Sequence, residues 1–312
     1  MTAPVKISAI ICTYNRYDLL GSAIDSCLAQ SMDQGDFDVI VVDNSPDAAG
    51  AKAFAAKYAD QTALSYVHET TPGLSNARNV GAAHSKAEIV AFLDDDAIAK
   101  PDWLAALVAA YDSFGPSTSV AGGKISPIWD QPRPSWLADD KLGYVSVVDW
   151  GGKTRPLGPS EWIAGANISF RRKALLDAGG FDTNLGRNGP EVNLLSNEET
   201  AVLRSLSDAG GIALYVPEAE VDHLVDRRRL NQEWFRRRAA WQAVSDFLSN
   251  PDIGQWSGNA MDNSLDYLLK QPPRHRAISG LCCELDDSDD FNDQINAVYN
   301  MTVAMLAGLK SV

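Results

Sequence analysis

The stretch Ile89-Val90-Ala91-Phe92-Leu93-Asp94-Asp95-Asp96 joins five apolar residues to three consecutive carboxylates. An apolar run of this length with β-branched residues is typical of a buried strand in a parallel sheet. Three aspartates cannot stay buried without partners, because the desolvation of an unpaired charge is costly. We therefore expect them at the carboxyl end of the strand, where open α/β sheets bind their ligands.

The carboxylates of Asp94, Asp95 and Asp96 repel one another unless a cation or hydrogen-bond donors lie between them. Mg²⁺ or Mn²⁺, shared with the diphosphate of a substrate, would supply the missing charge, since hard cations prefer oxygen ligands. A solvated acidic turn that leads into a helix near Pro101 explains the same tripeptide equally well. The tripeptide alone leaves both interpretations open.

The composition of the 312 residues is that of an ordinary globular protein, with 45% hydrophobic and 22% charged residues. This size suits one large domain, or one domain with an appendage. The net charge of −14 disfavours nucleic acid as a partner, because proteins that bind nucleic acid carry a basic surface. An anionic substrate would need a local positive site or a bound metal.

The cysteines and the hydropathy pattern favour an intracellular protein. Cys12 and Cys27 lie in apolar segments, and the adjacent Cys282 and Cys283 lack the spacing of a zinc site. We expect neither a signal peptide nor a transmembrane helix, because no basic N-terminal region and no apolar window of sufficient length is visible. The expected location is the cytoplasm, free or peripheral at the inner face of the membrane.

The N-terminal part of the chain predicts a βαβ unit. A strand at 7–12 is followed by a helix that Asp18 can cap, and a second strand at 39–42 ends in Asp43-Asn44. A parallel sheet with right-handed crossovers follows from this order. An Asp at the end of the second strand commonly binds a nucleoside, but Asp43 could also close the strand with an Asx turn.

Arg78 lies in the first turn of a helix that the breaker Pro72-Gly73 precedes. A positive charge there opposes the helix dipole. This broken local rule suggests a functional Arg that faces a phosphate or the three carboxylates, with an exposed helix Arg as the alternative.

The second half of the chain predicts strands at 121–126 and 161–170 around an aromatic, loop-like excursion at 129–159. The aromatic side chains of this excursion suit either stacking on sugar rings or pinning the loop to the core. Ser196 and Glu199 have the spacing of a capping box for the next helix. A helix at 231–248 and at least two helices in an acidic tail follow.

The ordered motifs resemble the inverting glycosyltransferases of family 2, which have the GT-A fold. The segments that carry the resemblance span about residues 5–245 and are, with their numbers, Ile10–Arg16, Val41–Ser45, Gly73–Gly81, Phe92–Asp96, Pro101–Leu104, Gly179–Asp182, Asn197–Glu199 and Val221–His223. The resemblance implies an α/β, Rossmann-like, mostly parallel sheet flanked by helices, with a helical C-terminal appendage.

The resemblance also implies roles for individual residues. The nucleotide would be bound by Thr13, Tyr14, Asn15, Arg16, Asp43, Asn44, Arg78, Asp94 and Asp95. A divalent cation, Mg²⁺ or Mn²⁺, would be held by Asp96, Asp94 and His223. The acceptor or the sugar would lie near Trp162, Gly165, Ala166 and Asn167.

The catalytic base of the family comes from a Glu-Asp pair that opens a helix. Here the pair is Glu198-Glu199, so the second position is longer by one methylene. Either carboxylate could serve, and we favour Glu199. The base would deprotonate an acceptor hydroxyl that attacks the anomeric carbon, so a single displacement inverts the configuration.

The implied function is the metal-dependent transfer of a hexose from a nucleotide sugar, with UDP expected, to a glycan, a lipid-linked glycan or a small hydroxyl acceptor. A non-catalytic binding protein on a degenerate transferase scaffold is the alternative. We expect a transferase domain at 1–248, with a nucleotide-binding half at 1–100 and an acceptor half at 101–248. A helical appendage at 249–312 would carry apolar faces that need the core or a second copy of the chain to cover them.

Overall fold

The computed structural model describes residues 5–187, 194–250 and 257–310. Three expected features lie partly or wholly outside these residues. They are the first four residues, the end of the glycine-rich loop at Gly189-Pro190, and the break at Pro251.

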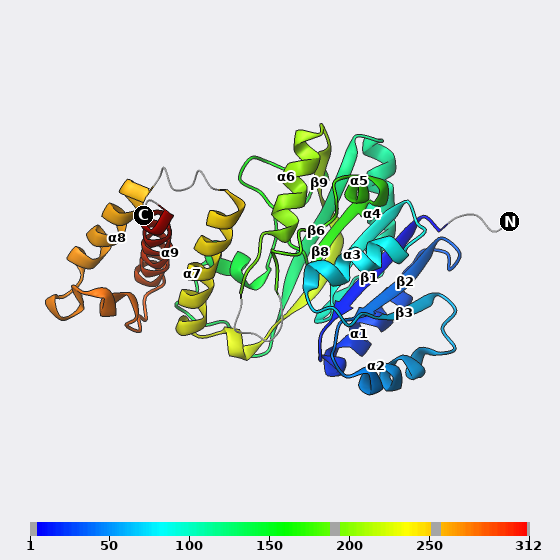
Figure 1. The fold of residues 1–312 in the computed structure, drawn as a ribbon, viewed down its shortest axis with the longest axis horizontal. Coiled ribbons are helices and arrows are strands. Elements are labelled where there is room, and N and C mark those ends of the chain that lie inside the picture. The colour runs from blue at the N-terminus through cyan, green and yellow to red at the C-terminus, as the bar shows by residue number, and fades with distance from the viewer. Residues whose placement is uncertain (1–4, 188–193, 251–256, 311–312) are drawn as a thin grey trace. The chain divides into compact units, whose positions relative to one another are not determined.

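A mixed sheet forms the centre of the fold, and within the described residues it has nine strands (Figure 1). Strands β1 (Ile7–Thr13), β2 (Phe37–Asp43), β3 (Leu64–His68) and β4 (Ile89–Asp94) pair in parallel in the order β3-β2-β1-β4. Antiparallel strands continue the sheet as β8 (Asn167–Arg171), β6 (Thr118–Trp129), β9 (Ile212–Val225) and β5 (Ala97–Ala99), while β7 (Arg155–Pro156) pairs with β9. The expected Rossmann-like α/β sheet is confirmed.

Helices cover both faces of this sheet because the side chains of each strand alternate between them. On β1, Ile7, Ala9 and Ile11 join one core cluster and Ile10 joins the other. The first cluster contains residues of α1 (Tyr17–Leu28), α2 (Ala48–Ala55) and α4 (Trp103–Phe114). The second contains residues of α3 (Leu74–His84), α5 (Arg172–Asp177) and α6 (Glu198–Asp208).

Two expectations for individual elements are wrong. The strand expected at 161–170 begins only at Asn167. The chain between Ile163 and Ala166 runs as coil and a turn. Asp18 does not precede the first helix but lies inside its first turn, since α1 begins at Tyr17 with Arg16 before it.

The chain divides into two compact units, which we describe separately. The first comprises Met1–Ile128, Ser146–Gly189 and Glu198–Leu224, and the second Trp129–Val145, Pro190–Asn197 and Val225–Val312. The second unit contains α7 (Gln232–Ser249), α8 (Ser257–Lys270), α9 (Ser288–Lys310) and the short helices η2 (Asp139–Val145), η3 (Arg227–Arg229), η5 (Pro273–His275) and η6 (Ile278–Leu281). The domain boundary expected near 248 stays a prediction, because a compact unit need not fold independently.

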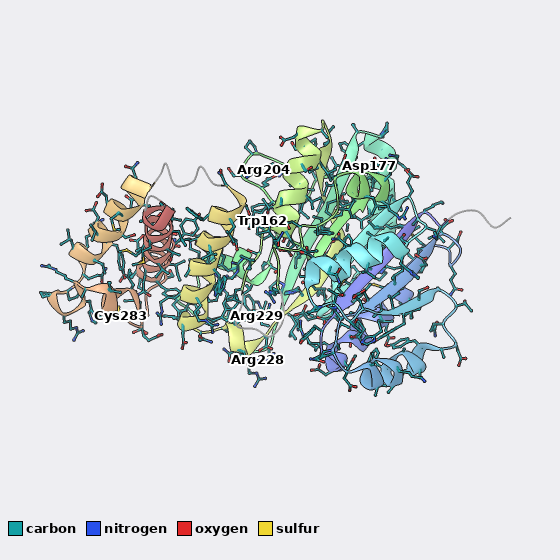
Figure 2. All side chains as sticks on the ribbon, viewed as in Figure 1. Trp162, Asp177, Arg204, Arg228, Arg229 and Cys283 are labelled. Carbon is teal, nitrogen blue, oxygen red and sulfur yellow. The ribbon has the colours of Figure 1, made fainter. Side chains whose placement is uncertain are left out.

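The aromatic excursion contributes to the cores of both units. In the second unit, Trp136 packs edge to face on Phe235 of α7 and on Phe291 of α9, with ring centroids 5.4 and 4.9 Å apart. In the first unit, Trp150 packs in the same way on Trp162, which is labelled in Figure 2. These contacts favour the interpretation that the aromatic residues pin the excursion in place.

Gly123 allows β6 to approach β9. A Cβ atom at this position would lie 1.8 Å from the carbonyl oxygen of Ala219 and 2.8 Å from that of Val216. Since both neighbours are backbone atoms, a side chain would push the strands apart.

We predict that Gly123→Ala lowers the free energy of unfolding by about 1–3 kcal/mol or more, the cost typical of overpacking. Gly152→Ala is the matched control, because a Cβ atom at that position would have nothing within 4 Å. Its free energy of unfolding should change by less than about 1 kcal/mol. Chemical denaturation measures both, and equal stabilities of the two variants would contradict the close strand approach.

Candidate active site

The carboxyl ends of β1, β2 and β4 meet at one edge of the sheet. The register places Thr13 of β1 beside Asp43 of β2, and Cys12 beside Asp94 of β4. The acidic run at the end of β4 therefore lies next to the loop that follows β1. This is the edge at which the sequence analysis expects a ligand.

Asp95 is held by side chains from the β1 edge. Its carboxylate accepts a hydrogen bond of 2.7 Å from the hydroxyl of Thr13 and one of 2.8 Å from Nη1 of Arg16. Burial raises the pKa of Asp95 to about 7. The guanidinium of Arg16 acts to lower this pKa, and the negative charge of Asp96 acts to raise it. Arg16 thus offsets part of the repulsion within the acidic run.

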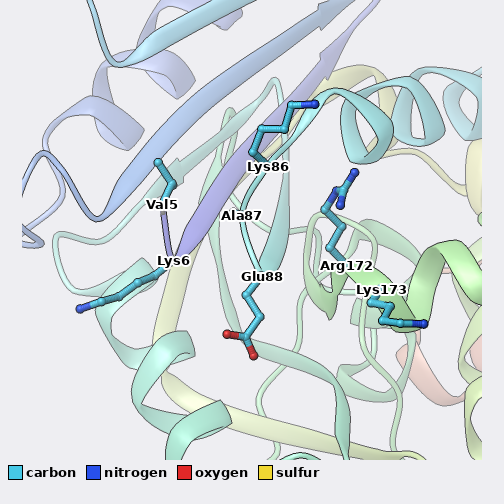
Figure 3. Close-up of a pocket in the computed structure, with 7 residues that line it drawn as sticks. All are labelled: Val5, Lys6, Lys86, Ala87, Glu88, Arg172 and Lys173. Carbon is cyan, nitrogen blue, oxygen red and sulfur yellow. The ribbon is translucent and has the colours of Figure 1, made fainter. Parts of the chain in front are cut away.

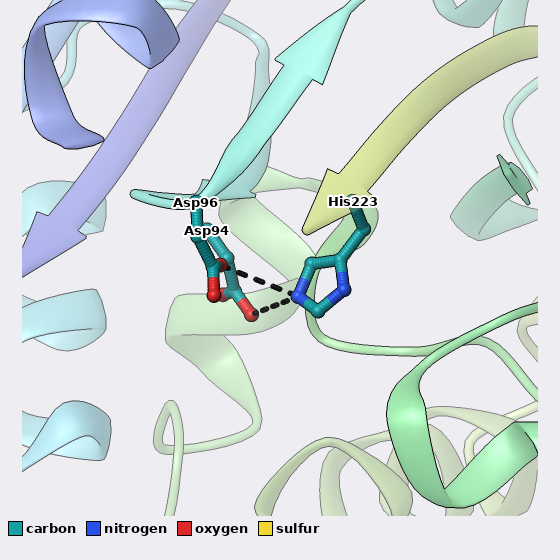
Figure 4. A group of neighbouring side chains, drawn as sticks. All are labelled: Asp94, Asp96 and His223. Atoms are coloured by element: carbon teal, nitrogen blue, oxygen red, sulfur yellow. Dashed lines mark ion pairs between the residues drawn. The ribbon is translucent and has the colours of Figure 1, made fainter. Parts of the chain in front are cut away.

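Asp94, Asp96 and His223 form a cluster that could hold a metal ion (Figure 4). Nε2 of His223 lies 3.3 Å from Oδ1 of Asp96 and 4.0 Å from Oδ2 of Asp94. The histidine reaches this position because β5 and β9 pair with Ala97 opposite His223. One donor atom of each residue lies within 4.8 Å of the others.

The donor set of this cluster fits a divalent cation. Two carboxylates and an imidazole suit Mn²⁺, and the carboxylates suit Mg²⁺. Nδ1 of His223 is buried and has no hydrogen-bond partner in the described part of the chain. Asp96 is also bound by Arg16, because Nη2 of Arg16 donates a hydrogen bond of 2.7 Å to Oδ2 of Asp96.

Arg78 of α3 lies between this cluster and a second acidic pair. Its side chain is only 3% exposed, and its Nη1 donates to Oε1 of Glu198 at 2.8 Å. Nη2 lies 3.6 Å from Oδ1 of Asp94, and the guanidinium stands 5.4 Å from the ring centre of Phe181. The alternative of an exposed helix Arg is therefore wrong, and Arg78 faces the carboxylates.

Glu198 and Glu199 open α6 but have different surroundings. Glu198 is tied to Arg78, whereas Oε1 of Glu199 accepts the backbone N–H of Gly165 at 3.2 Å. Burial and the charge of Glu198 raise the pKa of Glu199 to about 8, although Arg78 acts in the opposite direction. Since α6 starts at Glu198, Ser196 is not the residue before the helix, and the capping-box interpretation of Glu199 is wrong.

Asp43 is fully buried and already surrounded by donors. Its carboxylate accepts hydrogen bonds from the hydroxyls of Tyr17 and Tyr66 at 2.9 and 2.6 Å and from the backbone N–H of Ser45 at 2.9 Å. The bond to Ser45 is the Asx contact that the sequence left open. Sequence reasoning missed the two tyrosines, because Tyr66 reaches Asp43 only through the pairing of β2 with β3.

The remaining predicted nucleotide residues line the same edge. Asn44 fixes the following loop by donating to the carbonyls of Glu69 and Thr71 and accepting the N–H of Gly73. Asn15 is exposed in a left-handed conformation with φ of 56°, and Tyr14 beside it is half-buried.

Asn167 was predicted to lie near the acceptor or the sugar, but the structure places it inside the fold. Its side chain is 0% exposed and donates to the carbonyls of Lys124 and Ala219, while its oxygen accepts the indole N–H of Trp103. Because these bonds use its amide inside the fold, Asn167 ties strands together. Ala166 is buried as well. Gly165 adjoins Glu199 and Arg78, and Trp162 is half-buried.

A cavity of about 360 Å³ opens at the other end of the strands (Figure 3). Its lining includes Lys6, Lys86, Glu88, Arg172 and Lys173. Much of this charge is paired: Lys6 with Asp36, Lys173 with Asp177, and Arg172 with the carbonyls that end α3. The cavity lies away from the acidic site, at the start of β1 and β4.

The model of "Glycosyl transferase family 2" matches residues 8–176 of this chain. The glucosyl-dolichyl phosphate glucuronosyltransferase of Haloferax volcanii is 30% identical over 243 residues, which cover 77% of this chain and 76% of that protein. Other curated relatives are longer, and the aligned parts span 50% and 46% of two of them.

Solved structures share the fold. The mannosyltransferase PcManGT from Pyrobaculum calidifontis, in complex with GDP-Man and Mn²⁺, has a TM-score of 0.53 and 18% identity, over 100% of this chain and 76% of that chain. S. aureus TarS 1-349 in complex with UDP has a TM-score of 0.54 and 16% identity, over 97% of this chain and 91% of that chain. No helix among the residues described has the length and apolar character needed to cross a membrane.

We predict that Arg78→Met lowers the free energy of unfolding by about 3–5 kcal/mol, because it leaves Glu198 buried without its ion-pair partner. Arg228→Met is the control, since the side chain of Arg228 is 68% exposed in its pair with Asp226. That variant should lose less than about 1 kcal/mol. Similar losses in urea denaturation would contradict the buried role of Arg78.

Proposed function

Since this chain belongs to glycosyl transferase family 2, whose transferases have the GT-A fold, we propose that it is an inverting, metal-dependent glycosyltransferase that uses a nucleotide sugar. The observation that carries the proposal is the presence of two separate acidic groups. Asp94, Asp96 and His223 can hold a cation, while Glu199 lies beyond Arg78 with a raised pKa. A transferase of this kind needs both a cation site and a base.

The first acidic group is the proposed site of the leaving nucleoside diphosphate. Asp94, Asp96 and His223 would hold Mg²⁺ or Mn²⁺, and the ion would neutralise negative charge on the diphosphate. Thr13 and Arg16 hold Asp95 at the same edge and so keep the acidic run in place. The Mn²⁺ and GDP-Man in the PcManGT complex and the UDP in the TarS complex support a nucleotide and a metal here.

The second acidic group is the proposed source of the base. Glu199 would take the proton of an acceptor hydroxyl while the hydroxyl oxygen forms a bond to the anomeric carbon. The bond from that carbon to the diphosphate breaks in the same displacement, so the configuration inverts. Glu198 is the weaker candidate, because its carboxylate is bound to Arg78.

The acceptor is a carbohydrate, a lipid-linked glycan or another small hydroxyl compound in this proposal. The similarity to an enzyme named for glucosyl-dolichyl phosphate supports a lipid-linked acceptor. UDP is the proposed nucleotide of the donor, and a cytoplasmic location, free or at the inner face of the membrane, stays a prediction.

We predict that wild-type protein binds UDP more tightly with Mn²⁺ than without it, and that Asp96→Ala removes this difference. The loss of a direct ligand should exceed the roughly 10- to 100-fold that loss of an outer-shell partner costs. Isothermal titration with UDP, and with GDP as a second nucleotide, measures the effect. Asp177→Ala, at an exposed position of α5, is the control.

Mn²⁺-dependent UDP binding that survives in Asp96→Ala would contradict the metal assignment. No binding of either nucleotide by wild-type protein, with or without Mn²⁺, would contradict the donor class.

We predict that Glu199→Gln keeps UDP affinity and loses about 10²–10⁴ in the rate of donor turnover, the range typical of a lost general base. The substrate is the nucleotide sugar that wild-type protein hydrolyses fastest in a screen. Glu198→Gln should instead lose stability, because Arg78 loses its charged partner. An active Glu199→Gln together with an inactive Glu198→Gln would reverse the assignment.

The pKa of Glu199 also predicts a pH dependence. A base must be deprotonated, and burial followed by the charge of Glu198 raises this pKa to about 8. The value of kcat/KM, which reports the free enzyme, should therefore rise with pH and level off above about 8. Glu198→Gln should move the rise of kcat/KM to lower pH, because the charge of Glu198 would no longer raise the pKa of Glu199. A flat profile from about pH 6 to 9 would contradict Glu199 as the base.

A further inference from the structure

The helices α8 and α9 of the second unit pack on each other through apolar side chains, which include Leu268 of α8 and Met301 of α9. Residues 271–287 join the two helices at one end of the pair (Figure 1). We call residues 269–278, which end α8 and begin this connection, the α8 turn. Its sequence is Leu269-Lys270-Gln271-Pro272-Pro273-Arg274-His275-Arg276-Ala277-Ile278.

The α8 turn exposes an aliphatic side chain at each of its ends. Leu269 is 64% and Ile278 65% exposed, the largest fractions among the exposed large hydrophobic residues that the structure describes. Leu265, one helical turn before Leu269 on the same side of α8, is exposed as well. A single exposed aliphatic residue is ordinary on a protein surface, but three within or next to one short turn suggest a binding surface.

The α8 turn is held in its shape by its own hydrogen bonds. The backbone N–H of His275 donates to the carbonyl of Pro272 at 2.7 Å. Nε of Arg276 donates to the carbonyl of Gln271 at 2.8 Å. The chain then folds back so closely that a Cβ atom at Gly280 would lie 2.0 Å from the carbonyl oxygen of His275. The exposed aliphatic side chains therefore belong to a compact turn.

The α8 turn is also basic, although the net charge of the chain is −14. It contains three cations, Lys270, Arg274 and Arg276, and no acid. Within the described ranges none of these three side chains forms an ion pair, and the two arginines bond to His275 and to a backbone carbonyl. In the basic run 227–229, by contrast, two arginines pair with aspartates. The positive charge of the turn is thus available to an anionic partner.

We propose that the α8 turn docks on the surface of an anionic lipid bilayer. Leu269 and Ile278 enter the interface and leave water, which favours binding. The three cations lie at the phosphate groups of the lipids, where each strengthens binding by about fivefold. The inference is independent of the proposed transfer reaction, and it would bring the chain to the surface at which a lipid-linked acceptor lies.

The size and composition of the turn favour a bilayer over a protein partner. A stable protein–protein interface uses about 20–30 residues on each side, more than this turn offers. A bilayer takes up aliphatic side chains singly and presents many anionic groups at once. Peripheral membrane binding commonly combines such an apolar contribution with a basic one.

Acids on both sides of the turn restrict how it can meet a membrane. Asp262 and Asp266 are exposed on α8, and six acids lie at 284–293. At physiological ionic strength, exposed charges more than about 8 Å apart are largely screened from one another. The attraction therefore acts only where the turn itself faces the bilayer, and it should weaken as salt is added.

The test measures co-sedimentation of the full chain with two kinds of vesicle. One contains equal amounts of phosphatidylglycerol and phosphatidylcholine, and the other contains phosphatidylcholine alone. The variants change exposed side chains only, and circular dichroism checks that they are folded. They are the charge variant Lys270→Gln/Arg274→Gln, the apolar variant Leu269→Ser/Ile278→Ser, and the control Lys52→Gln/Lys153→Gln, which removes equal charge from exposed positions of the first unit.

We expect wild-type protein to bind the vesicles with phosphatidylglycerol and not those of phosphatidylcholine alone. The charge variant should lose about 10- to 30-fold in partition coefficient, because two cations are removed. The apolar variant should lose about tenfold or more, because the aliphatic contribution is lost. The control should stay within about twofold of wild type, since its lysines lie away from the turn.

The absence of wild-type binding to vesicles with phosphatidylglycerol would overturn the proposal, and so would equal binding to both kinds of vesicle. Unchanged binding by the charge and apolar variants would overturn it as well. Sedimentation velocity without vesicles tests a second copy of the chain as the partner. A dimer that dissociates in the apolar variant, while that variant still binds vesicles as wild type does, would assign the turn to self-association instead.

Discussion

Three adjacent carboxylates at the end of β4 repel one another, and the remainder of the site is arranged around that repulsion. Two unit charges 4 Å apart interact by about 4 kcal/mol at the effective dielectric constant of a protein surface. The two cations that offset the repulsion come from different elements, Arg16 from the loop after β1 and Arg78 from α3, and His223 of β9 lies beside Asp96. The strand order, with β4 beside β1 and β5 paired to β9, is what brings these groups to one edge.

Arg78 gives the two acidic groups different chemistry. It binds Glu198 directly and faces Asp94, so it stabilises charge on both sides, whereas Glu199 keeps a pKa of about 8. The room for its guanidinium depends on Gly165, where a Cβ atom would lie 2.5 Å from Nη2. One buried cation thus separates carboxylates that suit a metal from a carboxyl group that suits proton transfer.

The sequence was informative wherever a local pattern determines the structure. The apolar run with its three aspartates predicted β4 and its carboxyl edge. The unfavourable place of Arg78 on the helix dipole predicted that it faces a phosphate or the three aspartates, and it does face Asp94, but its shorter contact with Glu198 was not predicted. Contacts set by distant pairing were not predictable. Asn167 was expected at the sugar and instead ties strands inside the fold, and the tyrosines around Asp43 come from α1 and β3. The left-handed Asn197 was also missed, because its conformation depends on α7 and α9.

The central claim is that a divalent cation is held by Asp94, Asp96 and His223 next to a nucleoside diphosphate. The most direct measurement is anomalous X-ray diffraction at the manganese edge from crystals of the full chain grown with Mn²⁺ and UDP. The account predicts one strong peak in bonding contact with Asp96 and His223 and with a diphosphate oxygen. UDP bound at this edge with no manganese beside it, or manganese bound away from these three residues, would contradict the account.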